Sequence, residues 1–282
     1  MVSGFGRPRG PPDRERHLPP DGWHRAEETL SAPAFVDASY EGDLAQKAGA
    51  TMVVGRESRA QYGEPHAGKI FTKMRPVPNP KLFTELGLDV GLFALESNEI
   101  LPGSTGEADD AVQAYNFRVC WTRDPANRLP VPKPARYERD IYLELESRWR
   151  FTNRVPNAKT SWNAPLLIGG NRAYPAGDWA ARDEITARHR DLALGLLWFL
   201  QNDAVVPAGI RAEASQWGLP KDEFADNGGF PWEMYVREAR RLVGRKVFTQ
   251  ADGMAAPGLE RAPVQADSIA ITEWPLDSHS LH

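Results

Sequence analysis

Residues 115–122 alternate between large apolar and polar side chains, and this pattern constrains the fold more than any other in the chain. One face of the expected strand carries Tyr115, Phe117, Val119 and Trp121, and the other carries Asn116, Arg118, Cys120 and Thr122. A period of two is typical of a β-strand with one buried and one polar face. The polar face indicates either the solvent side of an antiparallel sheet or the wall of a cavity.

Three later segments have the periodicity of amphipathic α-helices. The first follows Asp178, a predicted N-cap, and its apolar stripe consists of Ile185, Leu192, Leu196, Phe199 and Leu200. The second is predicted over residues 207–218 and the third over 231–244, each with proline in the first turn and glycine at the end. The apolar side of the third would be formed by Trp232, Tyr235, Val236, Ala239, Leu242 and Val243.

Shorter elements are predicted elsewhere, with long loops between them. Strands are expected at 34–38, 51–54 and 268–272, and a short helix at 44–48. The chain has 24 prolines and 24 glycines, which indicate irregular structure over 63–110 and 124–180. Together these elements predict a mixed α/β chain in which a loop-rich part contains the helices and an antiparallel sheet.

Charge and motif content exclude several classes of function. A formal net charge of −4 gives no sign of a nucleic-acid or anionic-membrane partner, and no apolar run is long enough to span a bilayer. The six histidines are scattered and Cys120 is the single cysteine, so neither a metal site nor an internal disulfide is expected. A Gly-x-Ser-x-Gly nucleophile motif is absent.

Arg237 and Arg241 would lie one turn apart on the third predicted helix. Two guanidinium groups on one face could clamp a carboxylate or phosphate, but a solvated face with Glu233 paired to Arg237 explains the same residues. Cys120 also has two interpretations, as a nucleophile with its pKa lowered by Arg118 or as an inert, buried thiol.

Residues 35–43 predict a strand that runs into a turn of small residues and then a helix. Ligands of α/β proteins bind beyond such strand ends. A dinucleotide fingerprint is missing, because Gly4-x-Gly6 has no third glycine and no strand before it.

Several blocks, taken in order, closely resemble the bacterial FAD-dependent oxidoreductases that are often labelled xanthan-lyase-like. The resemblance covers roughly residues 34–282 and rests on Phe35–Leu44, Gly55-Arg56-Glu57, Gln113–Arg118, Trp217–Phe224, Tyr235–Arg241 and Asp277-Ser278-His279. It implies a glutathione-reductase-like flavoprotein with FAD as cofactor.

The resemblance also implies roles for individual residues. Those expected near the cofactor are Asp37, Ala38, Ser39, Gly42 and Asp43, where small side chains let the backbone approach the dinucleotide. Those expected on the substrate side are Asn116, Arg118, Arg237, Arg241 and His279, with Arg118, Cys120, Arg237 and Arg241 as candidates for catalysis.

Four parts are expected along the chain. They are a disordered segment at 1–31, a remnant of the FAD-binding domain at 32–62, a substrate-side domain at 63–265 and a return strand at 266–282. Family members carry a GxGxxG unit before the first block and a flavin-contacting segment after the last. We therefore expect a fragment that binds FAD weakly or not at all.

The expected function is flavin-mediated hydride transfer on a small-molecule substrate. The alternatives are a carbohydrate-binding module, which nine tryptophans would permit, and an inactive truncated gene product. Without an apolar leader in this sequence the expected location is the cytoplasm. The sequence indicates neither the substrate nor the oligomeric state.

Overall fold

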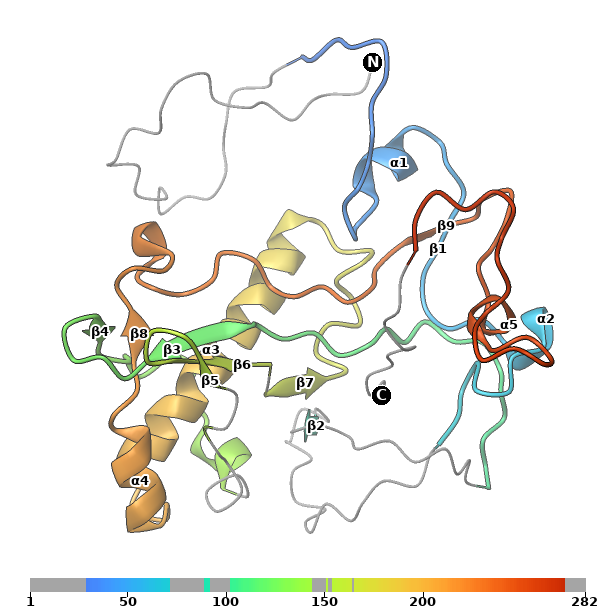
Figure 1. Cartoon of the computed structure of the whole chain (residues 1–282). Coiled ribbons are helices and arrows are strands. Elements are labelled where there is room, and N and C mark those ends of the chain that lie inside the picture. The colour runs from blue at the N-terminus through green and yellow to red at the C-terminus, as the bar shows by residue number, and fades with distance from the viewer. Residues whose placement is uncertain are drawn as a thin grey trace.

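The computed structural model describes residues 29–71, 89–91, 102–143, 151, 154–163 and 165–271. These residues form a mixture of helices and small antiparallel sheets (Figure 1). Every strand pair within them is antiparallel. The mixed α/β class is therefore confirmed at this level, whereas the glutathione-reductase-like detail stays a prediction.

The central sheet is built around β3 (Val119–Thr122), which pairs with β6 (Lys159–Trp162), and β6 pairs in turn with β5 (Arg154–Val155). The predicted apolar face is confirmed, because all its side chains are buried: Tyr115, Phe117, Val119 and Trp121. On the predicted polar face Arg118 is exposed and Cys120 partly buried, but Asn116 and Thr122 are buried. The rings of Trp121 and Trp162 meet edge to face across the sheet, with 5.1 Å between centroids. Aromatic side chains from neighbouring strands therefore form one layer of the core.

Helices α3 (Trp179–Asn202) and α4 (Ala208–Ala214) supply the other layer, and both confirm the prediction. The Asp178 carboxylate accepts a hydrogen bond of 2.9 Å from the Ala181 amide, as expected of an N-cap. The whole predicted stripe is buried against the sheet: Ile185, Leu192, Leu196, Phe199 and Leu200. Apolar burial at helical spacing therefore fixes which face of α3 turns inward.

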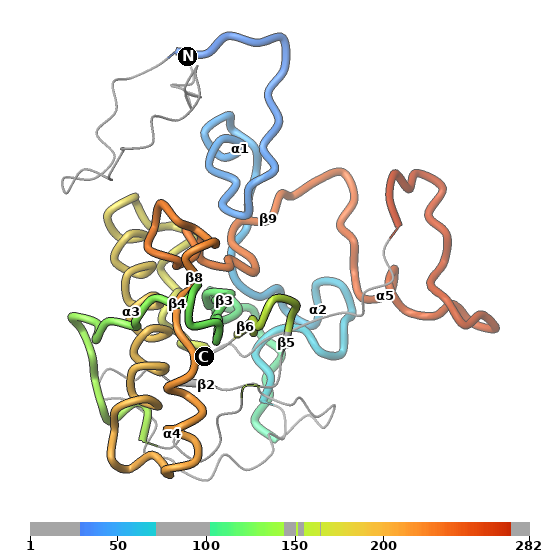
Figure 2. The backbone as a smooth tube through the Cα atoms, turned by 60° about the vertical axis from the view of Figure 1, so that its left-hand side comes forward, coloured from blue at the N-terminus to red at the C-terminus, as the bar shows by residue number. Residues whose placement is uncertain are grey.

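The remaining elements are short. They are α1 (Asp43–Lys47), β1 (Met52–Val53), α2 (Arg59–Tyr62), β2 (Asp89–Gly91), β4 (Arg128–Leu129), η2 (Arg139–Tyr142), β7 (Leu166–Ile168), β8 (Leu219–Pro220), η3 (Ala225–Asn227), β9 (Arg241–Leu242) and α5 (Gln250–Gly253). Two-stranded sheets join β1 to β9, β2 to β7 and β4 to β8. Figure 2 shows α2 and α5 together, away from α3 and α4, and the Gln250 amide donates to Glu64 Oε1 at 2.6 Å.

The third predicted helix is wrong, because residues 231–244, all of them described, contain no helix. Met234 and Val236 are buried, whereas Tyr235 and Arg237, which alternate with them, are only partly buried. Burial in this segment therefore has a period of two. Tyr235 also pairs with Asn116 in an antiparallel bridge. Aromatic and β-branched residues favour this extended path, and the helix-like spacing of the apolar positions was coincidental.

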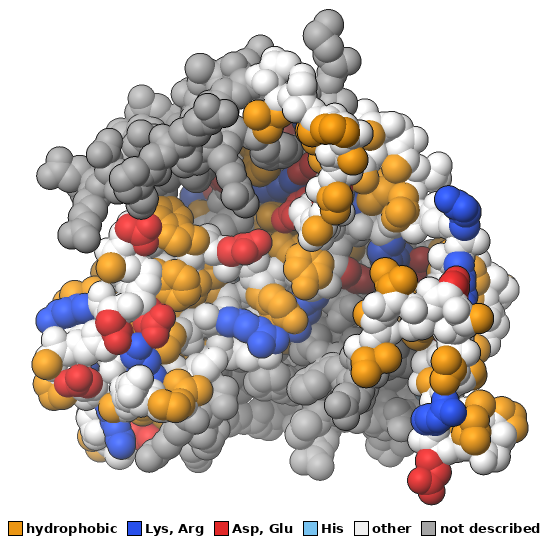
Figure 3. Space-filling model, turned by 45° about the horizontal axis from the view of Figure 1, so that its top comes forward, with side chains coloured by type: hydrophobic (Ala, Val, Ile, Leu, Met, Phe, Trp, Pro, Cys, Tyr) orange, Lys and Arg blue, Asp and Glu red, His pale blue; other side chains and the backbone are white. Residues whose placement is uncertain are grey.

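The strands predicted at 34–38 and 268–272 are also wrong as far as the structure describes them. Residues 34–38 and 268–271 are irregular and pair with no strand of the described part. Their apolar side chains are exposed, among them Phe35, Val36, Ile269 and Ile271. Figure 3 shows hydrophobic side chains spread between acidic and basic ones over the face that it displays. The strand at 51–54 and the helix at 44–48 are confirmed as β1 and α1.

Two sequence predictions lie outside the described residues. The segment at 1–31 is described only from residue 29, and His279 is not described. None of the helices in the described ranges combines the length and the apolar character needed to span a bilayer.

We expect a loss of stability in mild acid that depends on His189. This imidazole is buried in α3, its Nδ1 lies 2.8 Å from the Ile185 carbonyl oxygen, and burial lowers its pKa to about 4. In the unfolded chain the imidazole of His189 is protonated below about pH 6.5, whereas in the folded chain it is protonated only near pH 4. The free energy of unfolding should therefore fall by about 2 kcal/mol between pH 7 and 5.

Urea denaturation at both pH values measures this effect. In His189→Gln the pH-dependent part of the loss should vanish, whatever the substitution costs at pH 7. An unchanged pH dependence in this variant would assign the effect to other groups.

Candidate functional site

The turn that precedes α1 is organised by the carboxylate of Asp37. Its Oδ1 accepts hydrogen bonds from the Ser39 amide (3.0 Å) and hydroxyl (2.7 Å), and its Oδ2 accepts one of 2.9 Å from the Ala45 amide. Although burial raises the pKa of Asp37, these bonds hold it below its usual value. The Ser39 hydroxyl in turn accepts a bond of 3.1 Å from the Gly42 amide. Asp37 therefore acts as a local cap for the turn and for α1.

Asp43 is the centre of an ion-pair network that fastens this turn to the core. Arg182 of α3 donates two hydrogen bonds to its carboxylate, at 2.6 and 3.0 Å, and Arg240 donates a third. The bond from Arg182, together with that from Arg240, holds the pKa of Asp43 below its usual value against the effect of burial. Glu41 joins the network, because its carboxylate accepts from the Tyr174 hydroxyl at 3.0 Å and its carbonyl from Arg240 at 2.8 Å.

The residues expected near FAD do not form a pyrophosphate cradle in the described part of the chain. The amides of Ser39, Gly42 and Ala45 are already hydrogen-bonded to Asp37 or Ser39. The carboxylates of Asp37 and Asp43 place negative charge in the same turn, where a pyrophosphate would need donors. The cofactor contacts expected of Asp37, Ala38, Ser39, Gly42 and Asp43 therefore stay a prediction, and we derive no chemical step from them.

Asn116 and Arg237, both expected on the substrate side, are brought together by the structure. Arg237 donates from Nε to the Ala114 carbonyl at 2.9 Å and from Nη2 to Asn116 Oδ1 at 3.0 Å. Asn116 is fully buried and donates to Asn163 Oδ1 at 3.0 Å. This contact network joins two extended segments, so Arg237 has a role in holding the site together.

Because residues 231–244 form no helix, Arg237 and Arg241 do not share the helix face that a clamp would need. The guanidinium of Arg241 pairs with Glu57 at 2.9 Å and contacts Glu238 at 3.5 Å. It also donates to the Gly55 carbonyl, while Arg56 of the same block pairs with Asp109. The Gly55-Arg56-Glu57 block is therefore a junction between three distant segments of the chain.

Cys120 is partly buried, and its surroundings favour the inert one of the two interpretations left open by the sequence. Burial raises its pKa, the Glu223 and Asp222 carboxylates raise it further, and Lys159 opposes them only in part. Lys159 is itself paired with Asp222 at 2.9 Å and with Glu223 at 2.5 Å. A thiol in these surroundings stays protonated at neutral pH, which favours the inert interpretation.

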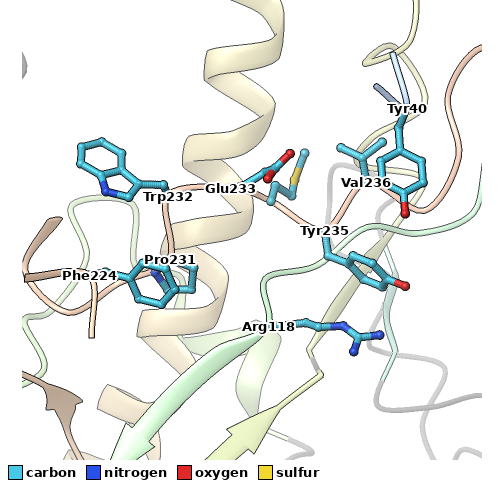
Figure 4. A pocket seen from close by; sticks show the side chains of 9 residues that line it. Tyr40, Arg118, Phe224, Pro231, Trp232, Glu233, Tyr235 and Val236 are labelled. Atoms are coloured by element: carbon cyan, nitrogen blue, oxygen red, sulfur yellow. The ribbon is translucent and has the colours of Figure 1, made fainter. Parts of the chain in front are cut away.

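A groove of about 410 Å³ lies beside the segment 231–236 (Figure 4). Its lining consists of Tyr40, Arg118, Phe224, Pro231, Trp232, Glu233, Met234, Tyr235 and Val236. In Figure 4 the side chains of Tyr40, Tyr235 and Arg118 lie toward one end of the groove, and those of Phe224 and Pro231 lie toward the other. Four of the sequence blocks that carry the family resemblance each contribute at least one of these residues.

Several residues of this region escaped the sequence-based prediction. Tyr40 and Trp232 line the groove, and Arg182 and Arg240 hold the turn that carries Tyr40. One signal was available for Arg182, because it lies three residues before Ile185, on the apolar stripe of α3. A charge on a buried stripe indicates a buried partner.

Metal-ligand geometry is not seen in the described ranges, where no group of three or more His, Cys, Asp or Glu residues could hold an ion.

The buried tryptophans bear on the carbohydrate-binding alternative. Trp121, Trp162 and Trp217 are in the core, while Trp179 and Trp232 are exposed and only Trp232 lines the groove. Tryptophans in a core count against a sugar-binding face.

The sequence matches the family described as FAD dependent oxidoreductase over residues 23–282, nearly the whole chain. Neither the curated proteins nor the solved structures contain a match to it. The family match confirms the resemblance that the separate sequence blocks indicated. The chain therefore belongs to the FAD dependent oxidoreductases, a family of enzymes whose cofactor is FAD.

Proposed function

We propose that this chain provides the substrate-side part of a FAD-dependent oxidoreductase and that a small molecule is oxidised or reduced in the groove beside residues 231–236. The observation that supports this most directly is the convergence of four distant sequence blocks on one cavity. Tyr40, Arg118, Phe224 and Tyr235 come from these four blocks and all line the groove. Its volume, about 410 Å³, falls in the range of small-molecule sites.

The division of the chain is part of the proposal. We assign residues 32–62 to the cofactor side, because they carry the Asp37–Asp43 turn, and residues 63–265 to the substrate side, because they supply most of the groove. Family membership and the buried tryptophans support an oxidoreductase rather than a carbohydrate-binding module. A cytoplasmic location belongs to the same proposal, since the sequence suggested it.

Titration of the purified chain with FAD tests the proposal, with flavin fluorescence as the first measurement. We expect weak binding that is lost on gel filtration, because the amides of the Asp37 turn are already engaged. With FAD in excess and oxygen removed, a panel of hydroxy acids, polyols and amines is then screened for loss of the oxidised flavin absorbance.

Groove variants connect this activity to the site. Trp232→Ala should raise the KM of a substrate found in the screen by about tenfold, because it removes an exposed wall of the groove. Trp179→Ala removes an exposed tryptophan from outside the groove and should leave KM unchanged. Stoichiometric FAD that stays bound through gel filtration would contradict the expected weak binding, and equal effects of the two substitutions on KM would contradict the assignment of the groove.

A further inference from the structure

The most unusual feature of the groove is the surroundings of the Tyr235 ring. The guanidinium carbon of Arg118 lies 4.1 Å from its centroid and that of Arg237 lies 4.7 Å from it. Arg237 is fixed by its bonds to Ala114 and Asn116. The Tyr235 ring therefore contacts one arginine that is fixed by hydrogen bonds, Arg237, and a second arginine that lines the groove, Arg118.

Arg118 differs in its partners from the three arginines of the ion-pair networks described above. Arg182, Arg240 and Arg241 are each paired with carboxylates, whereas Arg118 is exposed and has no carboxylate partner among the described residues. Stacking on Tyr235 restrains the plane of its guanidinium without using its N–H groups. A restrained guanidinium with open donors matches the two oxygens of a carboxylate.

The rest of the groove favours a flat apolar body on the ligand. Phe224, Pro231 and Trp232 supply rings on one side of the cavity, and the lining as a whole is largely apolar. Arg118 is the one cationic residue in the lining and Glu233 the one acidic residue. A second negative charge on the ligand would therefore meet no second cation in the groove.

We propose that the groove binds a small monocarboxylate with a flat apolar body and that Arg118, positioned by Tyr235, receives the carboxylate. This inference rests on the proposed function, since it names the substrate class of the same site. No reaction step is added, because the proposal concerns recognition alone. Tyr235 is a positioning residue, and it acts through the orientation of Arg118.

Benzoate and benzamide test the proposal, because they share one shape and differ in charge. Binding is measured on the full chain without FAD, by tryptophan fluorescence and ligand-observed NMR. We expect benzoate to bind at least tenfold more tightly than benzamide, and phenyl phosphate to bind no more tightly than benzoate. Equal binding of benzoate and benzamide, absence of benzoate binding, or tighter binding of phenyl phosphate would each overturn the proposal.

Variants locate the binding. Arg118→Met should reduce benzoate affinity to that of benzamide, whereas Arg123→Met, which removes an exposed arginine 5.9 Å from the Trp217 ring, should not. Tyr235→Leu should lower the ratio of benzoate affinity to benzamide affinity, whereas Tyr235→Phe, which keeps the aromatic ring, should leave this ratio at the wild-type value. An unchanged ratio in Arg118→Met would refute the assignment. A negative benzoate experiment would not change the result of the FAD titration, and a negative titration would not change the benzoate affinities. The monocarboxylate proposal and the proposed function can therefore be refuted separately.

Discussion

Replacing Gly55 with alanine is expected to lower the free energy of unfolding by about 4 kcal/mol. Gly55 has φ +84°, a conformation that costs an L-residue energy. A methyl group there would lie 2.1 Å from the Asp109 carbonyl oxygen and 2.5 Å from the Asp110 Cα, both of them backbone atoms that cannot turn aside. The chain would have to separate residues 55–56 from 109–110.

Gly63→Ala is the matched control for this substitution. Gly63 has φ +70°, but no atom lies within 4 Å of the position that its Cβ would take. It should therefore cost only the conformational strain, about 1 kcal/mol. Urea denaturation measures both variants, and similar losses would show that close approach of the backbone at Gly55 has no effect.

Replacing Asp43 with asparagine is expected to cost about 3 kcal/mol, because it removes the charge that two buried arginines share. The side chains of Arg182 and Arg240 are 5% and 8% exposed, so water cannot solvate the cations that are left. Asparagine keeps the shape of the side chain, and the loss therefore reports on charge. Chemical denaturation at pH 7 measures it.

Asp110→Asn is the control, since Asp110 pairs with Arg172 where the two side chains are 71% and 51% exposed. Because both side chains are exposed to water, that pair should contribute far less to stability than the Asp43 network. The pKa of Asp43 is lowered in the folded protein, so its contribution is present above about pH 4 and fades as pH falls through the lowered folded value. A difference between wild type and Asp43→Asn that stays constant down to strong acid would argue against the ion pair.

The elements that could be predicted are those whose burial is decided by local periodicity. The strand at 115–122 and the helix that follows Asp178 each have one face that must leave water, and the sequence displays that face directly. The helix predicted over 231–244 failed because Trp232, Tyr235, Val236 and Ala239 recur at helical spacing, while the buried pair Met234 and Val236 fits an extended segment. Only pairing with Asn116 decides between them, and no local pattern contains that contact.

In the candidate site, too, local periodicity predicts some features, whereas others depend on contacts between distant parts of the sequence. The alternation placed Arg118 opposite a buried face and left it on either a solvent side or a cavity wall, and in the structure it is exposed and lines the groove. Asp43 was expected near the cofactor, but its actual partners are Arg182 and Arg240, at sequence separations of 139 and 197 residues. Which carboxylate pairs with which arginine depends on packing over such distances. The cofactor roles predicted for residues 37–43 stay a prediction.

The network around Asp43 has a consequence for the order in which the chain can fold. During synthesis residues 37–47 leave the ribosome early, but their anchors Arg182 and Arg240 follow much later. The helix pair α3–α4 and its sheet can form from contacts that are closer in sequence, whereas the Asp43 turn must wait for Arg240. The groove, which needs Tyr40 from this turn, is therefore completed only after residue 240 has been synthesised.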